Sequence, residues 1–129
     1  MISRAITTCC ALAVSVAAML AAGTAYADNA ALFDAADLAA KEQRLGDMER
    51  AYDDILANDP SNVRALSGKA AAQAWTQRYA EAQATYKRAI AIAPGNADNH
   101  VGLGYAYAWN GEYPAAHAAF RGALRLEPN

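Results

Sequence analysis

From residue 28 onward, apolar residues recur at intervals of three and four, which is the spacing that places side chains on one face of an α-helix. One such stripe contains Leu32, Ala36 and Ala39. Short polar segments interrupt the stripes at residues 43–46, 76–78 and 110–112. Because an apolar stripe ends at each polar segment, the pattern predicts pairs of amphipathic helices, each pair joined by a short turn.

Prolines divide this pattern at a fixed interval. Pro60, Pro94 and Pro128 are spaced by 34 residues each. Proline lacks a backbone N–H and clashes with the preceding helical turn, so each of the three predicted second helices should end near one of them. Asn62 and Asn96 follow two of the prolines and are the predicted helix N-caps. Pro114 differs, because it falls at the expected start of a helix, where the missing N–H costs nothing.

The 34-residue interval also aligns Trp75 with Trp109 and Tyr79 with Tyr113. Within the last interval the residues follow the order His100-x2-Leu103-Gly104-x2-Tyr107, then Ala116-x3-Phe120, then Pro128. This order resembles the tetratricopeptide repeat, whose pattern is W-x2-L-G-x2-Y, A-x3-F and P. The middle interval keeps Ala82-x3-Tyr86 before its proline, and the first keeps only Met48-x3-Tyr52.

The resemblance implies an all-α fold, an α-solenoid of three stacked helix-turn-helix repeats. The predicted units are a degenerate first repeat at 28–60, a second at 61–94 and a third at 95–129. One helix pair cannot bury its own apolar side, so three stacked pairs are close to the minimum for a stable array. The third repeat has no polar capping helix after it, and Tyr113, Phe120, Leu124 and Leu126 would then face a missing neighbour. We therefore expect self-association or docking at that end.

Residues 1–27 are predicted to be a signal peptide. Arg4 precedes an apolar run over residues 5–22, and Ala25 and Ala27 form the small-x-small pattern read by a signal peptidase. Cleavage is expected between Ala27 and Asp28, which would place the protein in the periplasm or outside the cell. The alternative is an uncleaved membrane anchor, since the run approaches the ~20 residues that span a bilayer. After cleavage no stable membrane span is expected.

Composition narrows the possible functions. Both cysteines, Cys9 and Cys10, lie in the predicted signal peptide, so the mature chain is expected to use neither disulfides nor thiol chemistry. The formal net charge of -2, or -3 without Arg4, gives no reason to expect nucleic-acid binding. Acidic residues dominate 28–59 and basic residues dominate the rest. This asymmetry indicates either head-to-tail pairing or ordinary solvated helix faces.

No residue constellation predicts catalysis. The two histidines, His100 and His117, lie on different predicted helices, and the chain has no His-Glu-x-x-His, Gly-x-Ser-x-Gly or phosphate-binding glycine loop. A metal site wants more converging ligands than two histidines offer. The sequence therefore predicts a protein that is not an enzyme and that has no metal and no cofactor.

A second stripe runs along each predicted first helix, with a spacing of four residues. Its three triples are Phe33, Asp37 and Lys41; Ser67, Ala71 and Trp75; and Val101, Tyr105 and Trp109. The 34-residue interval would stack them side by side. In the proteins that this sequence resembles, the corresponding face lines a concave groove that holds an extended peptide. Some of those proteins bind a terminal carboxylate with clustered Lys, Arg and Asn, and the triples lack such a cluster.

The sequence thus predicts a scaffold or adaptor that binds a protein or peptide of the bacterial cell envelope through an aromatic groove. Its repeats are similar to periplasmic repeat segments of polysaccharide-export and outer-membrane proteins. The alternative is direct carbohydrate binding, in which aromatic faces stack on sugar rings. The role of Trp75 and Trp109 also stays open between a ligand platform and packing of the core.

Overall fold

The computed structural model describes residues 28–128, and all of its regular secondary structure is helical. A first helix occupies residues 28–41. Five more follow: α2 (Leu45–Asn58), α3 (Val63–Trp75), α4 (Tyr79–Ile92), α5 (Ala97–Trp109) and α6 (Tyr113–Leu126). The predicted all-α fold is confirmed. The predicted signal peptide and its cleavage site lie outside the described residues.

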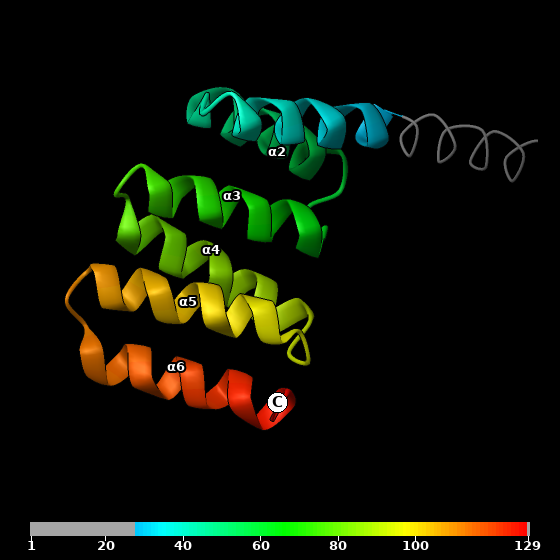
Figure 1. Cartoon of the computed structure of the whole chain (residues 1–129). Coiled ribbons are helices and arrows are strands. Elements are labelled where there is room, and N and C mark those ends of the chain that lie inside the picture. The colour runs from blue at the N-terminus through cyan, green and yellow to red at the C-terminus, as the bar shows by residue number, and fades with distance from the viewer. Residues whose placement is uncertain (1–27, 129) are drawn as a thin grey trace, which may run out of the picture. The chain divides into compact units, whose positions relative to one another are not determined.

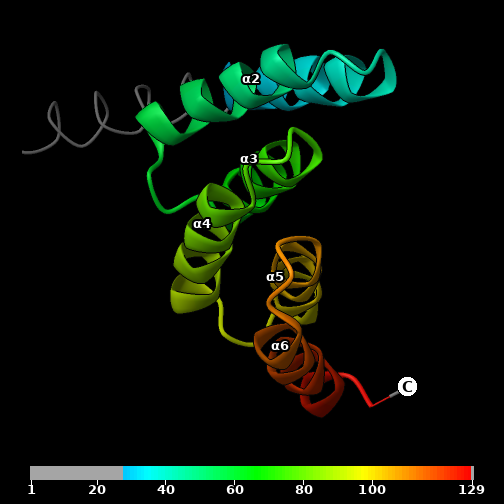
Figure 2. The ribbon, with the colours of Figure 1, turned by 90° about the vertical axis from the view of Figure 1, so that its left-hand side faces the viewer.

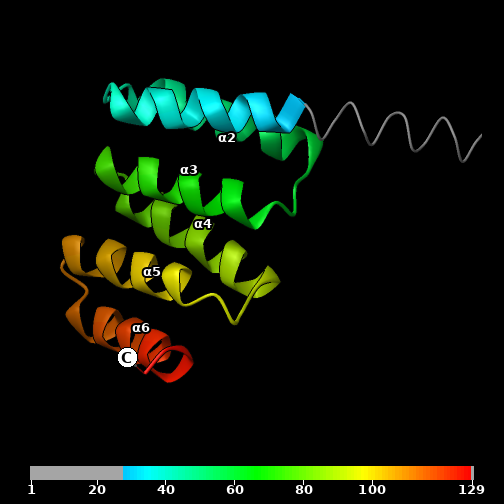
Figure 3. The same ribbon diagram turned by 45° about the vertical axis from the view of Figure 1, so that its right-hand side comes forward.

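Contacts divide the chain between Ala31 and Leu32, and the following description concerns the unit from Leu32 onward. Within it, each helix from α2 to α6 packs against the next one along the chain, and α3 also contacts α5 (Figure 1). The helices form layers in chain order, as a view from another side also shows (Figure 3). Seen nearly along their axes, the pair α3–α4 is followed by the pair α5–α6 (Figure 2). This stacking is that of a helical solenoid. The limits of the three predicted repeats stay predictions.

Within residues 28–128, no helix combines the length and the apolar character that crossing a membrane requires.

The helix ends follow most of the predicted signals. Asn62 caps α3, since its side chain accepts a hydrogen bond from the Ala65 backbone N–H at 3.0 Å. Asn96 occupies the N-cap of α5 without a side-chain capping bond. Pro114 lies in the first turn of α6, as predicted. The expected turn at 43–46 is wrong in part, because α2 already begins at Leu45, which packs against the core.

The three turns within the helix pairs share one backbone feature. Gln43, Gln77 and Gly111 are spaced by 34 residues and all have a positive φ, of 57°, 63° and 81° respectively. A side chain makes this left-handed conformation unfavourable by about 1–2 kcal/mol, whereas glycine adopts it freely. Two of the three turns therefore contain a residue that fits its conformation poorly.

We expect Gln77→Gly to raise the free energy of unfolding by about 0.5–1 kcal/mol, because glycine removes the backbone strain but adds entropy to the unfolded chain. The reciprocal variant Gly111→Gln should lower it by a similar amount, and urea unfolding monitored by circular dichroism measures both. If both variants shifted stability in the same direction, the turn conformation would not be the cause.

The core is built mainly from alanines, which allow helices to approach closely. One cluster joins the first helix, α2 and α3, and a second joins α3, α4, α5 and α6. Among the described residues, Ile55 and Leu66 are the largest fully buried apolar side chains. The rings of Tyr52 and Tyr86 lie against Gly68 and Gly102 on the following helix, where an added Cβ would come within 2.2 and 2.4 Å of a ring carbon. The aromatic ring of one pair thus packs directly on the backbone of the next.

A polar link recurs at equivalent positions of consecutive pairs. The Arg78 guanidinium at the start of α4 donates to the Glu49 carboxylate on α2. Thirty-four residues on, the Gln83 amide on α4 donates to the Glu112 carboxylate before α6 at 3.0 Å. The bond from Gln83 is the main cause that lowers the pKa of Glu112. Because the pKa falls on folding, the link contributes fully above the ordinary glutamate pKa and is lost as the pH falls through the folded value.

The outer face of α6 carries exposed apolar side chains at Tyr113, Leu124 and Leu126. Phe120, which was expected to face a missing neighbour, is only partly exposed, because its ring packs against Tyr105 with centroids 5.3 Å apart. Self-association through this end stays a prediction.

Candidate binding groove

The nine predicted groove residues lie on three helices, one triple on each of the first helix, α3 and α5. They do not form one continuous stripe. Instead, the structure gathers most of them into three local sites, at which they meet residues that the sequence analysis did not select. Two of the nine take part in none of the contacts below: Lys41 is exposed and Ala71 is partly buried.

The first site is aromatic and lies at the C-terminal ends of α3 and α5. Trp75, Trp109 and Tyr105 are 54%, 51% and 50% exposed. Tyr105 and Trp109 stack with their ring centroids 5.5 Å apart, and Tyr79 contacts Trp109 at 6.3 Å. A pocket of about 220 Å³ is lined by Ala74, Trp75, Gln77, Tyr79 and Trp109. Half-exposed tryptophans do not fill the core, so the packing interpretation of these two residues is wrong.

The second site joins the first helix to α3. The Arg64 guanidinium lies 3.6 Å from the Asp37 carboxylate and 4.0 Å from the centre of the Phe33 ring. This arrangement combines an ion pair with a cation–π contact. Arg64 is therefore already engaged by two of the predicted groove residues.

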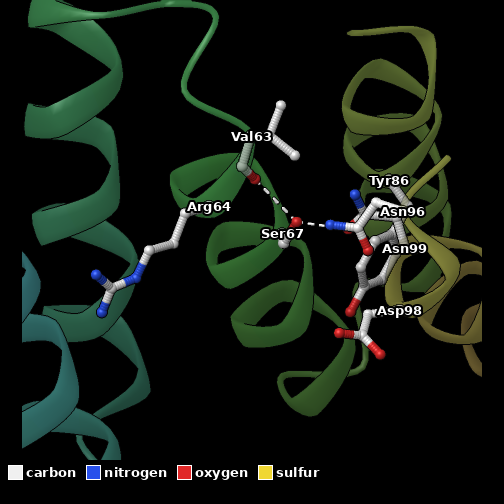
Figure 4. A pocket seen from close by; sticks show the side chains of 7 residues that line it. All are labelled: Val63, Arg64, Ser67, Tyr86, Asn96, Asp98 and Asn99. Atoms are coloured by element: carbon white, nitrogen blue, oxygen red, sulfur yellow. Dashed lines mark hydrogen bonds between the residues drawn. The ribbon is translucent and has the colours of Figure 1, made fainter. Parts of the chain in front are cut away.

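The third site is a polar pocket of about 440 Å³ between α3 and α5. It is lined by Val63, Arg64, Ser67, Tyr86, Asn96, Asp98 and Asn99 (Figure 4). Arg64 points away from the other lining residues in this view. Asn99 is only 1% exposed. The Ser67 hydroxyl contacts its Oδ1, and among the described residues its Nδ2 has no hydrogen-bond partner.

Val101 lies beside a further, more apolar pocket of about 390 Å³ near the end of the described chain. Its other lining residues are Ala97, Asp98, Phe120, Ala123, Leu124 and Glu127. Asp98 lines both this pocket and the polar pocket. Its carboxylate therefore lies on the boundary between two neighbouring cavities.

The sequence analysis missed Arg64, Asp98, Asn99 and Tyr79. Arg64 and Asp98 lie 34 residues apart, and each precedes a predicted groove residue by three positions. Residues three apart share a helix face, so extending each stripe by one step would have found both. Tyr79 was noted only as an aligned aromatic. Nothing in the pattern marked Asn99, because its importance comes from burial.

Titratable side chains form no metal site here: within residues 28–128, no group of three or more His, Cys, Asp or Glu could hold an ion. His100 is partly buried, and its Nε2 lies 3.1 Å from the carbonyl oxygen of Pro94. This contact gives the ring a structural partner at the entry to α5.

Comparison with known proteins adds to this geometry. Residues 76–129 match the family model of the tetratricopeptide repeat. The chain carries tetratricopeptide repeats. The match covers the last two helix pairs apart from α3, and the described array continues the same fold toward the N-terminus. No curated protein matches the sequence closely enough to count as a relative.

Several solved structures share the fold. A mutant O-GlcNAc transferase of Thermobaculum terrenum is 28% identical with a TM-score of 0.77, and the match covers 81% of this chain but only 20% of that one. The repeat domain of Arabidopsis OM64 is 23% identical with a TM-score of 0.74, covering 78% and 84%. The second repeat domain of human RPAP3, solved with an HSP70 peptide, is 23% identical with a TM-score of 0.77, covering 81% and 88%.

Proposed function

We propose that this protein is an exported, non-enzymatic scaffold that binds an extended segment of another protein in the bacterial periplasm or cell envelope. The observation that carries the proposal is the aromatic site, in which Trp75, Tyr105 and Trp109 are half exposed next to a small pocket. Aromatic side chains exposed together on one face are typical of binding surfaces, because they offer a large contact area at a low entropy cost.

The solved structures support peptide binding as the mode of action. The RPAP3 domain holds an HSP70 peptide with the sequence SGPTIEEVD, which is acidic at its end. This chain has a different groove. The one cation that lines its polar pocket, Arg64, is paired with Asp37. The partner should therefore differ in chemistry from that acidic peptide.

A random 12-residue peptide library displayed on phage tests this proposal, with protein purified from cells that express the full chain as the target. Enriched peptides should compete with one another and should change the fluorescence of Trp75 and Trp109. Failure to enrich any peptide, combined with enrichment of oligosaccharides on a glycan array, would overturn peptide binding in favour of the carbohydrate alternative.

Export is the second part of the proposal, and it is supported by the Arg4, apolar-run and Ala25-x-Ala27 pattern of residues 1–27. We expect the protein in the periplasmic fraction, with Asp28 as its first residue. Mass spectrometry of the intact protein measures this directly. A replacement of Ala25 and Ala27 by bulky residues should block cleavage, and an unchanged mass in this variant would contradict the predicted site. A protein that starts at Met1 in the membrane fraction would support the anchor instead.

A further inference from the structure

The polar pocket contains a buried amide whose hydrogen bonding is incomplete. The Ser67 hydroxyl contacts two groups, the Val63 carbonyl oxygen at 2.8 Å and the Asn99 side chain. A hydroxyl has one proton, so it can donate only once. If that proton goes to Val63, the Ser67 oxygen must accept from Asn99, and only the NH₂ end of the amide can donate.

Whichever end of the amide faces Ser67, its other polar atom stays buried without a partner among the described residues. Such an atom is unfavourable by about 1–3 kcal/mol. Proton counting favours the orientation in which this atom is the carbonyl oxygen, which is an acceptor. The pocket therefore offers an unused acceptor at its floor.

The other groups that line the pocket extend this acceptor character. The Asp98 side chain is exposed, and no ion pair engages its carboxylate within the described chain. Asn96 makes no capping bond with its side chain, and the Tyr86 hydroxyl can also accept. The cation Arg64 turns toward Phe33 and Asp37 and away from the other lining residues (Figure 4). The interior thus has a net negative charge from Asp98.

We propose that the polar pocket receives the ammonium group of a lysine side chain in the bound segment. This inference rests on the proposed peptide-binding function. An ammonium group has three donors and no acceptor, so it matches the Asp98 carboxylate and the free end of the Asn99 amide. A lysine stem is long and apolar, so it can pass Val63 at the rim while its charged end reaches the polar floor.

The distance between this pocket and the aromatic site predicts the spacing in the partner. Asp98 and Trp109 lie on the same helix, eleven residues apart. At a helical rise of about 1.5 Å per residue they are separated by roughly 16 Å along the axis. An extended peptide spans about 3.3 Å per residue, so it covers this distance in about five residues. The partner should carry a lysine about five residues from an apolar side chain held between Trp75 and Trp109.

The phage selection described above, followed by synthetic peptides, tests the inference. Enriched sequences should share a lysine at that spacing from an aromatic or aliphatic residue. An N-acetylated synthetic copy contains lysine as its only ammonium group. Norleucine in place of that lysine keeps the stem and removes the charge, and it should weaken binding roughly fivefold to thirtyfold.

Asp98→Asn should weaken binding of the lysine peptide by a similar factor and leave binding of the norleucine peptide unchanged. Asp54→Asn, at an exposed aspartate on α2, is the matched control and should change neither. Isothermal titration calorimetry measures all six affinities. Enriched peptides without lysine, or a norleucine effect that persists in Asp98→Asn, would overturn the lysine pocket while peptide binding stands. Failure to enrich any peptide would overturn both.

Discussion

Replacing Leu66 by alanine is expected to lower the free energy of unfolding by about 2–5 kcal/mol. Leu66 lies in α3 and is completely buried. Most of its buried neighbours in the core are alanines, which are short and cannot reach into the cavity that the substitution leaves. Because the array is small, its total stability is expected to be of the same order as this loss. The variant should therefore be partly unfolded at room temperature, as circular dichroism and urea titration would measure.

Leu38→Ala provides the control, because the same atoms are removed from a side chain that is 52% exposed. Its free energy of unfolding should change by less than about 1 kcal/mol. A similar loss in both variants would point to helix propensity instead of cavity formation. A stable Leu66→Ala variant would show that α3 can shift to fill the space, which the close packing of Tyr52 on Gly68 argues against.

Much of this fold could be predicted from the sequence because its signals are local and repeated. The prolines at 60, 94 and 128 indicated where helices end, and α2 and α4 do end within two residues of Pro60 and Pro94. The tryptophans were expected to close their helices, and α3 and α5 end at Trp75 and Trp109. Each of these features depends on a few neighbouring residues, so one sequence is sufficient to reveal it.

The sites were less predictable, because they depend on contacts between residues far apart in the chain. The stripe of Ser67, Ala71 and Trp75 was expected to act as one surface. Instead, Ser67 meets Asn99 from the next pair, while Trp75 shares a pocket with Tyr79 and Trp109. Helical spacing places residues on a face but does not say which residue of a neighbouring helix lies opposite. Burial of Asn99 follows from that packing, and a polar residue near a helix start gives no signal of it.

Exposure at the aromatic site separates folding from binding. Trp109 is about half exposed, and its contacts are with Tyr105 and Tyr79, of which Tyr105 is itself half exposed. Truncating such a side chain leaves no closed cavity. A tryptophan at the centre of a binding surface, in contrast, often accounts for a large share of the binding free energy.

Trp109→Ala is therefore expected to change the free energy of unfolding by less than about 1 kcal/mol and to weaken binding of a selected peptide by about 2–4 kcal/mol, roughly a thirtyfold to thousandfold loss. Tyr113→Ala is the control, because Tyr113 is the exposed aromatic at the position equivalent to Tyr79 and lines no part of the pocket between the tryptophans. It should leave both quantities nearly unchanged. Urea unfolding and calorimetric titration of each variant give the two numbers. A loss of about 3–5 kcal/mol in stability, with normal binding by the folded fraction, would show that Trp109 supports the fold and that the partner binds elsewhere.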